Sequence, residues 1–173
     1  HHALSTGVPV LPLFIFDTEI LDGLSQKDAR VAFLHASLTK MRTTLQQEAD
    51  SSLAVYHGKP MDVFDRLRNG TDYDITAIYT NRDYEPYALQ RDEAIAKWAK
   101  ENQIGFKTFK DQVIFEKDEV VKDDGKPYVV YTPYMKRWKA TFNSATSLLD
   151  YEIATYFSHF IKDTKLPWSS LKD

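Results

Sequence analysis

The sequence predicts an α/β fold: a Rossmann-like parallel sheet with helices on both faces. Short apolar runs of strand length alternate with longer segments whose apolar residues recur at helical spacing. Such alternation is typical of parallel strands joined by right-handed crossover connections. The chain has 173 residues, 43% hydrophobic and 27% charged, which suits one globular domain with a short appendage.

The predicted strands are short and apolar. Residues 8–16 (VPVLPLFIF) are the first and end at Asp17, with Pro12 requiring a bulge or a neighbour that needs no hydrogen bond there. Residues 52–56 (SLAVY) and 75–79 (ITAIY) follow. Residues 106–109 and 113–115 form a last strand pair, or a strand and a loop.

Three helices are predicted between these strands, over residues 25–49, 59–67 and 85–102. Pro60 and Pro86 each fall in a first turn, where proline is favoured. Both long helices are expected to be amphipathic. Their inward-facing residues are predicted to be Val31, Leu34, Leu38, Met41 and Leu45 in one, and Ala88, Ala94, Ile95, Trp98 and Ala99 in the other.

The pattern changes after residue 115. A turn is predicted at residues 123–125, a helix at 133–142 and further helical spacing at 148–161. Four aromatic residues are expected to pack this return segment onto the sheet: Tyr128, Tyr131, Tyr134 and Trp138. We therefore place the α/β domain at residues 1–143 and a helical linker at 144–173.

Composition excludes several classes of function. The net charge is −3, and the basic stretch at residues 136–139 is too small to hold duplex DNA alone. The absence of cysteine excludes disulfides and thiolate chemistry and fits a cytoplasmic protein. No run is long enough to cross a membrane, so no membrane partner is expected. No metal-ligand spacing, GxSxG, P-loop or GxGxxG is present, so we expect no metal site.

Three segments carry a family resemblance that extends over residues 8–142. They are Phe14-Ile15-Phe16-Asp17 with Glu19-Ile20-Leu21; Tyr79-Thr80-Asn81, Asp83, Glu85-Pro86-Tyr87 and Arg91-Asp92; and Gly125-Lys126-Pro127-Tyr128, Thr132-Pro133-Tyr134 and Trp138. In order and spacing they resemble the N-terminal domain of the DNA photolyase and cryptochrome family, most of all the class I cyclobutane pyrimidine dimer photolyases.

The resemblance implies a light-driven DNA-repair flavoprotein with two domains. In the family, FAD in a C-terminal helical domain splits pyrimidine dimers in UV-damaged DNA, and the N-terminal domain holds an antenna pigment that passes energy to FAD. This chain lacks that C-terminal domain and the family's central first strand, so it is expected to have no catalytic residue and no repair activity alone. The parent would be a deoxyribodipyrimidine photolyase, a carbon–carbon lyase. A cryptochrome photoreceptor, or a freestanding nucleotide-binding α/β domain, stays an alternative, and the oligomeric state and lesion type stay open.

A pigment site is expected at the carboxyl ends of the strands, where ligands of open α/β sheets bind. Residues 17–20, 57–60 and 81–85 follow predicted strands and should share this rim. Apolar side chains would form walls, polar ones would hold the ring edge, and an arginine would either bind an anionic tail or stay solvated. The candidate pigment-binding residues are Phe16, Asp17, Ile20, Asn81, Arg82, Asp83, Glu85 and Tyr87. Phe16 serves equally well as core, and Glu85 is favoured by the helix dipole in any case.

The resemblance also bears on which pigment is bound. The folate-binding branch of the family typically has an Asn-Glu pair where this chain has Tyr87 and Ala88. A buried ring donor left without its acceptor costs about 1–3 kcal/mol, and Tyr87 adds bulk. A flavin or deazaflavin is therefore favoured over methenyltetrahydrofolate, with an empty pocket as the alternative.

Overall fold

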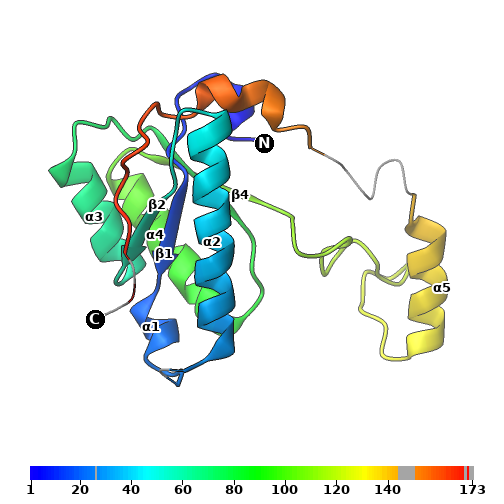
Figure 1. Ribbon diagram of the computed structural model, residues 1–173. Helices are drawn as coiled ribbons and strands as arrows, with labels where there is room; N and C mark the ends of the chain where they lie inside the picture. Colours follow the sequence, from blue (N-terminus) through cyan, green and yellow to red (C-terminus); the bar gives the residue numbers. More distant parts are fainter. Residues whose placement is uncertain (26, 144–150, 170, 172–173) are drawn as a thin grey trace.

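The computed structural model describes residues 1–25, 27–143, 151–169 and 171 (Figure 1). Its body contains strands in two parallel pairs: β1 (Leu13–Phe16) with β2 (Ala54–His57), and β3 (Ala77–Asn81) with β4 (Gly105–Phe109). The alternation of strands and helices predicted from the sequence is confirmed, and the fold is α/β.

Three helices connect these strands: α2 (Ala29–Glu48), α3 (Pro60–Gly70) and α4 (Pro86–Glu101). A short helix, α1 (Thr18–Leu21), precedes α2, which begins after the N-cap Asp28 rather than at residue 25. Asp28 has extended backbone angles and accepts the backbone N–H of Arg30, so it fixes the start of the helix. Both α3 and α4 begin at proline, as predicted.

The strands pair as two separate two-stranded sheets. β1 pairs with β2, and β3 pairs with β4. Within the described part of the chain no pairing joins β1 to β3. Residues of β1 and β3 are mostly half-buried, whereas Ala54 and Val55 of β2 are fully buried. β1 and β3, whose apolar residues suit the centre of a sheet, therefore each have one edge that is not paired with another described strand.

The first strand is shorter than the sequence predicted. Residues 8–12 are not in a strand, although Val10 forms an isolated bridge to Phe160. Pro9 and Pro12 have no N–H to donate, so a continuous ladder cannot form there. The carbonyl of Pro12 still accepts the N–H of Ala54 at 2.9 Å and leads the chain into β1.

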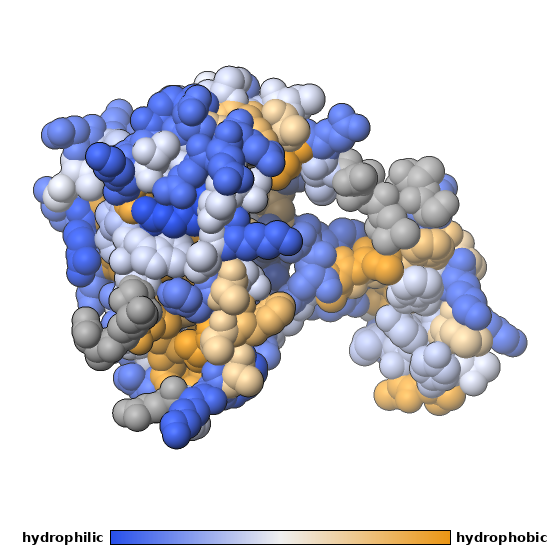
Figure 2. Space-filling view, viewed as in Figure 1, coloured by the Kyte–Doolittle hydropathy of each residue, from blue (hydrophilic) through white to orange (hydrophobic). Residues whose placement is uncertain are grey.

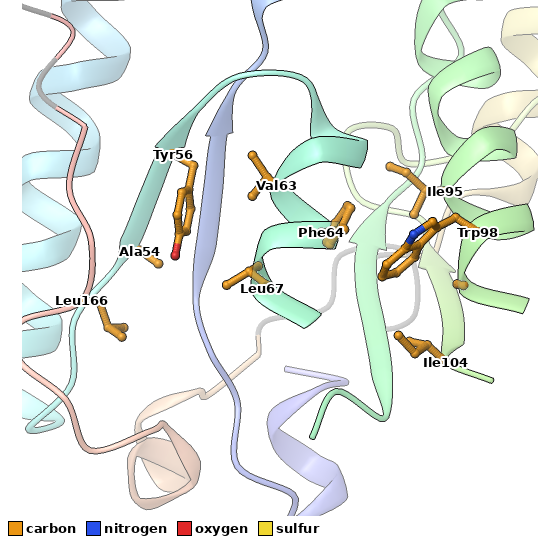
Figure 3. Close-up of a cluster of buried hydrophobic side chains, with 10 residues drawn as sticks. Ala54, Tyr56, Val63, Phe64, Leu67, Ile95, Trp98, Ile104 and Leu166 are labelled. Carbon is orange, nitrogen blue, oxygen red and sulfur yellow. The ribbon is translucent and has the colours of Figure 1, made fainter. Parts of the chain in front are cut away.

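Helices cover both faces, as predicted. On one face, residues of α3 and α4 pack with Tyr56 of β2 in a cluster that also reaches Ile78 and Phe106 of the other sheet (Figure 3). Trp98 of α4 also donates its indole N–H to Asp65 of α3 at 2.8 Å. Because this cluster reaches strands of both sheets, it holds the two halves of the body together.

The other face of the β1–β2 pair is covered by α2. Leu38 and Leu45 of α2 are buried with Phe16 and Val55. Leu34 and Met41 were predicted to face inward, but they are 40% and 52% exposed. The helix contacts a pair of strands rather than a wide sheet, so only a narrow stripe of it is covered. On α4, Ala94 is likewise exposed, against prediction.

The segment after β4 leaves the body as an arm that ends in α5 (Tyr131–Thr141), and the arm stands apart from the sheets (Figure 1). Residues 113–115 form a loop, not a strand. The expectation that the aromatic residues pack onto the sheet is wrong. Trp138 contacts Phe115 and Phe142, and Tyr128 contacts Tyr134. The arm therefore has a small aromatic cluster of its own, with apolar surface left in view (Figure 2).

The chain returns to the body at residue 151. A 3₁₀ helix, η2 (Ala154–His159), packs near the first one, η1 (Leu4–Thr6). Phe160 then bridges to Val10, a turn follows at residues 164–165, and Trp168 bridges to Val55 of β2. Residues 160 and 161, where the predicted helical spacing ended, are not helical. The predicted helical positions 148–150 lie outside the described residues. No described helix combines the length and the apolar character needed to span a bilayer.

Candidate functional site

Asp17 is the buried polar group at the carboxyl end of β1. It follows the last residue of the strand and is 6% exposed. Its Oδ1 accepts the backbone N–H of Glu19 at 3.0 Å, which caps α1. Its Oδ2 accepts the hydroxyl of Tyr87 at 2.5 Å. A carboxylate has about four acceptor sites, so each oxygen can still accept a further donor.

Tyr87 lies in the first turn of α4 and reaches from there to β1. Burial raises the pKa of its hydroxyl to about 12, and the negative charges of Asp17 and Glu19 act in the same direction. Tyr87 is therefore a neutral hydrogen-bond donor at any physiological pH. Its contact with Asp17 joins two rim segments that are 70 residues apart.

Lys59 brings the segment after β2 to the same rim. Its ammonium pairs with Glu19 of α1 at 2.6 Å, and both side chains are at least half exposed. Hydrogen bonding to Glu19 raises the pKa of Lys59. The predicted meeting of the segments after β1 and β2 is thus present, although no spacing or motif in the chain predicts this ion pair.

Arg82 is held by β4 and by the loop that follows β4. Its Nε and Nη2 donate to the hydroxyl and carbonyl oxygens of Thr108, each at 3.1 Å, and its Nη1 pairs with Glu116. These partners occupy the guanidinium that would have to bind an anionic tail. Neither Thr108 nor Glu116 was singled out in the sequence, because the contact depends on the register of β3 against β4.

The remaining predicted polar residues serve the start of α4. Asp83 accepts the N–H of Glu85 at 3.1 Å, and this hydrogen bond lowers the pKa of Asp83. Glu85 is the exposed N-cap residue of α4 and makes no side-chain cap. Asn81 ends β3 and is exposed. The hydrogen bond from Glu85 to Asp83 fixes the start of α4, which carries Tyr87. The side chains of Asn81 and Glu85 remain exposed at the edge of the rim.

The two apolar candidates differ in placement. Phe16 is 2% exposed and packs edge-on against Phe14 within the core. Ile20 is 48% exposed on α1. Apolar surface lies over α1 and the first half of α2, where Phe33 and Leu34 are also exposed (Figure 2). Ile20 is therefore accessible to a flat ligand at this rim, whereas Phe16 belongs to the core.

The arrangement provides hydrogen-bond acceptors next to apolar surface, which suits binding of a heteroaromatic ring edge. Within the described residues no group of three His, Asp or Glu side chains is placed to hold a metal ion.

Comparison with known proteins identifies the family. The profile of the DNA photolyase family matches residues 1–151. A curated relative, "Deoxyribodipyrimidine photo-lyase" of a Synechococcus strain, is 32% identical over 138 residues, which are 80% of this chain and 28% of the relative. The chain thus spans just over a quarter of the length of that relative.

Two solved structures share the fold. A bacterial class III photolyase from Agrobacterium tumefaciens superposes with a TM-score of 0.64 at 25% identity, covering 81% of this chain and 27% of that one. An archaeal photolyase from Sulfolobus tokodaii, solved with two FAD molecules, has a TM-score of 0.60 at 33% identity, covering 67% and 26%. These matches, together with the family profile, show that this chain belongs to the DNA photolyase family.

Proposed function

We propose that this chain is the antenna-pigment domain of a deoxyribodipyrimidine photolyase, and that its rim binds a flavin or deazaflavin. The observation that carries the proposal is Asp17, a buried carboxylate at the end of β1 with acceptor capacity left on both oxygens. A flavin or deazaflavin ring presents an N–H between two carbonyls, and a carboxylate is a strong acceptor for such a donor.

The similarity to the Sulfolobus tokodaii photolyase supports this choice of pigment class. The second FAD molecule in that protein implies a novel light-harvesting cofactor there, and this chain is 33% identical to it over the aligned part. Tyr87 and Ala88 stand where the folate-binding pattern has its Asn-Glu pair, so the carboxylate that would accept from a folate ring is absent at that point.

The parent protein is proposed to be a carbon–carbon lyase that repairs UV-damaged DNA by light. Its FAD and its DNA contacts would belong to a C-terminal domain, with residues 144–173 of this chain leading toward it. The net charge of −3 fits a domain that does not hold DNA by itself. A pigment bound at this rim would absorb light and pass the energy to FAD.

The test is titration of the 173-residue chain with FMN, a deazaflavin and methenyltetrahydrofolate, followed by absorbance. We expect flavin or deazaflavin binding, weakened about tenfold or more in Asp17→Ala, since hydrogen bonds to a charged group contribute about 1.5–3 kcal/mol. Asp74→Ala is the matched control, because Asp74 is an exposed carboxylate before the amino end of β3. Folate binding without flavin binding, or equal affinities in the two variants, would refute the proposal.

A further inference from the structure

We propose that residues 160–169 form a strap, and that Arg42 acts as a latch that holds this strap on the edge of β2 facing away from β1. By holding it there, the latch fixes where the strap meets the rim of the candidate pigment site. Figure 1 shows this segment running from η2 along β2 toward α1. That the rim binds a pigment rests on the proposed function, whereas the latch rests on contacts within this chain.

The strap is hydrogen-bonded to the body at both ends. The N–H of Val10 donates to His159 at 2.8 Å, and the N–H of Ile161 donates to Val10 at 3.0 Å. Further along, the N–H of Val55 donates to Pro167 and the N–H of Ser169 donates to Val55, each at 2.9 Å. The second set occupies the edge of β2 that faces away from β1, an edge that would otherwise be open to another strand.

Arg42 ties three elements together from its place on α2. Its Nη1 donates to the carbonyl of Leu53 at 3.1 Å, just before β2, and its Nη2 donates to the carbonyl of Leu166 at 2.9 Å. The same guanidinium lies 4.9 Å from the ring centroid of Trp168. A planar fork that bonds two carbonyls and stacks on an indole is specific to arginine.

Other contacts seat the strap between Arg42 and the core. Leu166 is 3% exposed and belongs to the cluster that contains Ala54 and Tyr56. Gln46 of α2 donates to Thr164 at 2.9 Å, and Lys162 donates to the carbonyl of Ala49 at 2.7 Å. The strap is therefore built into the domain rather than resting on its surface.

The direction of the strap gives the latch its role. The bridge between Val55 and Trp168 is parallel, so the strap runs the same way as β2, toward the carboxyl ends of the strands. Leu171 packs on the same cluster as Phe16 and as Leu21 of α1. Arg42 is thus a positioning residue that fixes where the strap meets the rim.

Hydrogen exchange of individual backbone amides tests the latch. In Arg42→Met we expect the Ser169 amide to exchange about tenfold faster, the factor that corresponds to ~1.4 kcal/mol of lost hydrogen bonding, while amides of the β1–β2 pairing keep their protection. Arg42→Lys should not restore protection, because an ammonium cannot fork between two carbonyls and stack. Trp168 fluorescence should shift to the red as the indole becomes hydrated.

Arg66→Met is the matched control. Arg66 is exposed on α3 and lies 5.6 Å from the ring centroid of Tyr56, so a contact between a guanidinium and an aromatic ring is removed without removing a hydrogen bond to the strap. Unchanged Ser169 exchange in Arg42→Met, or equal loosening in Arg66→Met, would overturn the proposal. If Arg42→Met loses protection everywhere, Trp168→Ala decides: loss confined to the strap supports the latch, and unchanged strap protection overturns it.

Two separate measurements distinguish this inference from the proposed function. Flavin titration of the unmodified chain tests the pigment site alone, whereas the exchange measurement needs no pigment. If the chain binds no flavin but Arg42→Met loosens the strap selectively, the latch stands and only the proposed role of the rim is refuted. If the chain binds flavin but Arg42→Met does not loosen the strap, the pigment site stands and the latch is refuted.

Discussion

The hydroxyl of Tyr87 donates to the carboxylate of Asp17 at 2.5 Å, across 70 residues of sequence. This contact joins the first turn of α4 to the end of β1. It also fills one acceptor position of the only buried carboxylate in the described part of the chain. A ligand that binds Asp17 must therefore share Oδ2 with Tyr87 or displace its hydroxyl.

We expect Tyr87 to titrate well above the ordinary pKa of a tyrosine hydroxyl. Its folded pKa of about 12 lies above the ordinary value of 10.0, so the folded state holds the proton more tightly than the unfolded chain. The stabilisation is complete below pH ~10 and is lost as the pH rises through about 12. Tyrosinate absorbance during alkaline titration measures this, and Tyr87→Phe should remove a step near pH 12. Loss of an ordinary step near pH ~10 instead would contradict the burial of this hydroxyl.

Replacing Asp28 should destabilise α2 at its first turn. Asp28→Ala removes the cap on the Arg30 N–H and is expected to lower Tm by about 2–4 °C, as loss of one cap does in a domain of this size. Asp28→Ser, which keeps a capping oxygen, should restore most of the loss. Thermal unfolding followed by circular dichroism is the measurement, and equal Tm values for the Ala variant and the unmodified chain would refute the role.

The same residue predicts an acid dependence. The side-chain hydrogen bond from Arg30 lowers the pKa of Asp28 to about 2. A depressed folded pKa means that its contribution is present above the unfolded value and is lost as the pH falls through about 2. The difference in Tm between Asp28→Ala and the unmodified chain should therefore shrink between pH ~4 and pH ~2. A difference that stays constant over this range would mean that the charge on Asp28 contributes nothing.

Arg82 is expected to have little effect on pigment affinity. Its guanidinium is already bonded to Thr108 and Glu116, so Arg82→Ala should change the Kd for FMN by less than about threefold. Arg82→Lys serves as the charge-preserving control. A loss of tenfold or more in Arg82→Ala, with Arg82→Lys unaffected, would show that the side chain leaves Glu116 to bind the phosphate.

The open edges of β1 and β3 should accept another strand. We expect an N-terminal extension with about five Val and Ile residues to pair in parallel with these edges, because no described strand pairs β1 with β3 and β-branched residues suit a buried parallel strand. We expect it to raise Tm by about 5 °C. The same extension with a central proline is the control, since proline cannot donate to the ladder. Equal Tm values for the two extensions would contradict strand insertion.

The order and type of the elements in the body could be predicted from the residues alone. Pro60 and Pro86 marked helix starts correctly, because proline needs no N–H partner in a first turn. The apolar runs ending at Phe16 and near Tyr56 predicted β1 and β2 to within a few residues. The family motifs likewise depended only on local residue order.

Which residues meet across the molecule could be learned only from the folded chain. No periodicity links Tyr87 to Asp17, Arg82 to Glu116 or Arg42 to Leu166, because each contact joins segments brought together only by strand register and helix packing. Burial follows the same rule: Met41 has the spacing of an inward residue but is exposed, since α2 covers two strands and not a full sheet. Sequence periodicity identifies an apolar stripe on a helix, whereas the width of the surface it packs against decides how much of that stripe is buried.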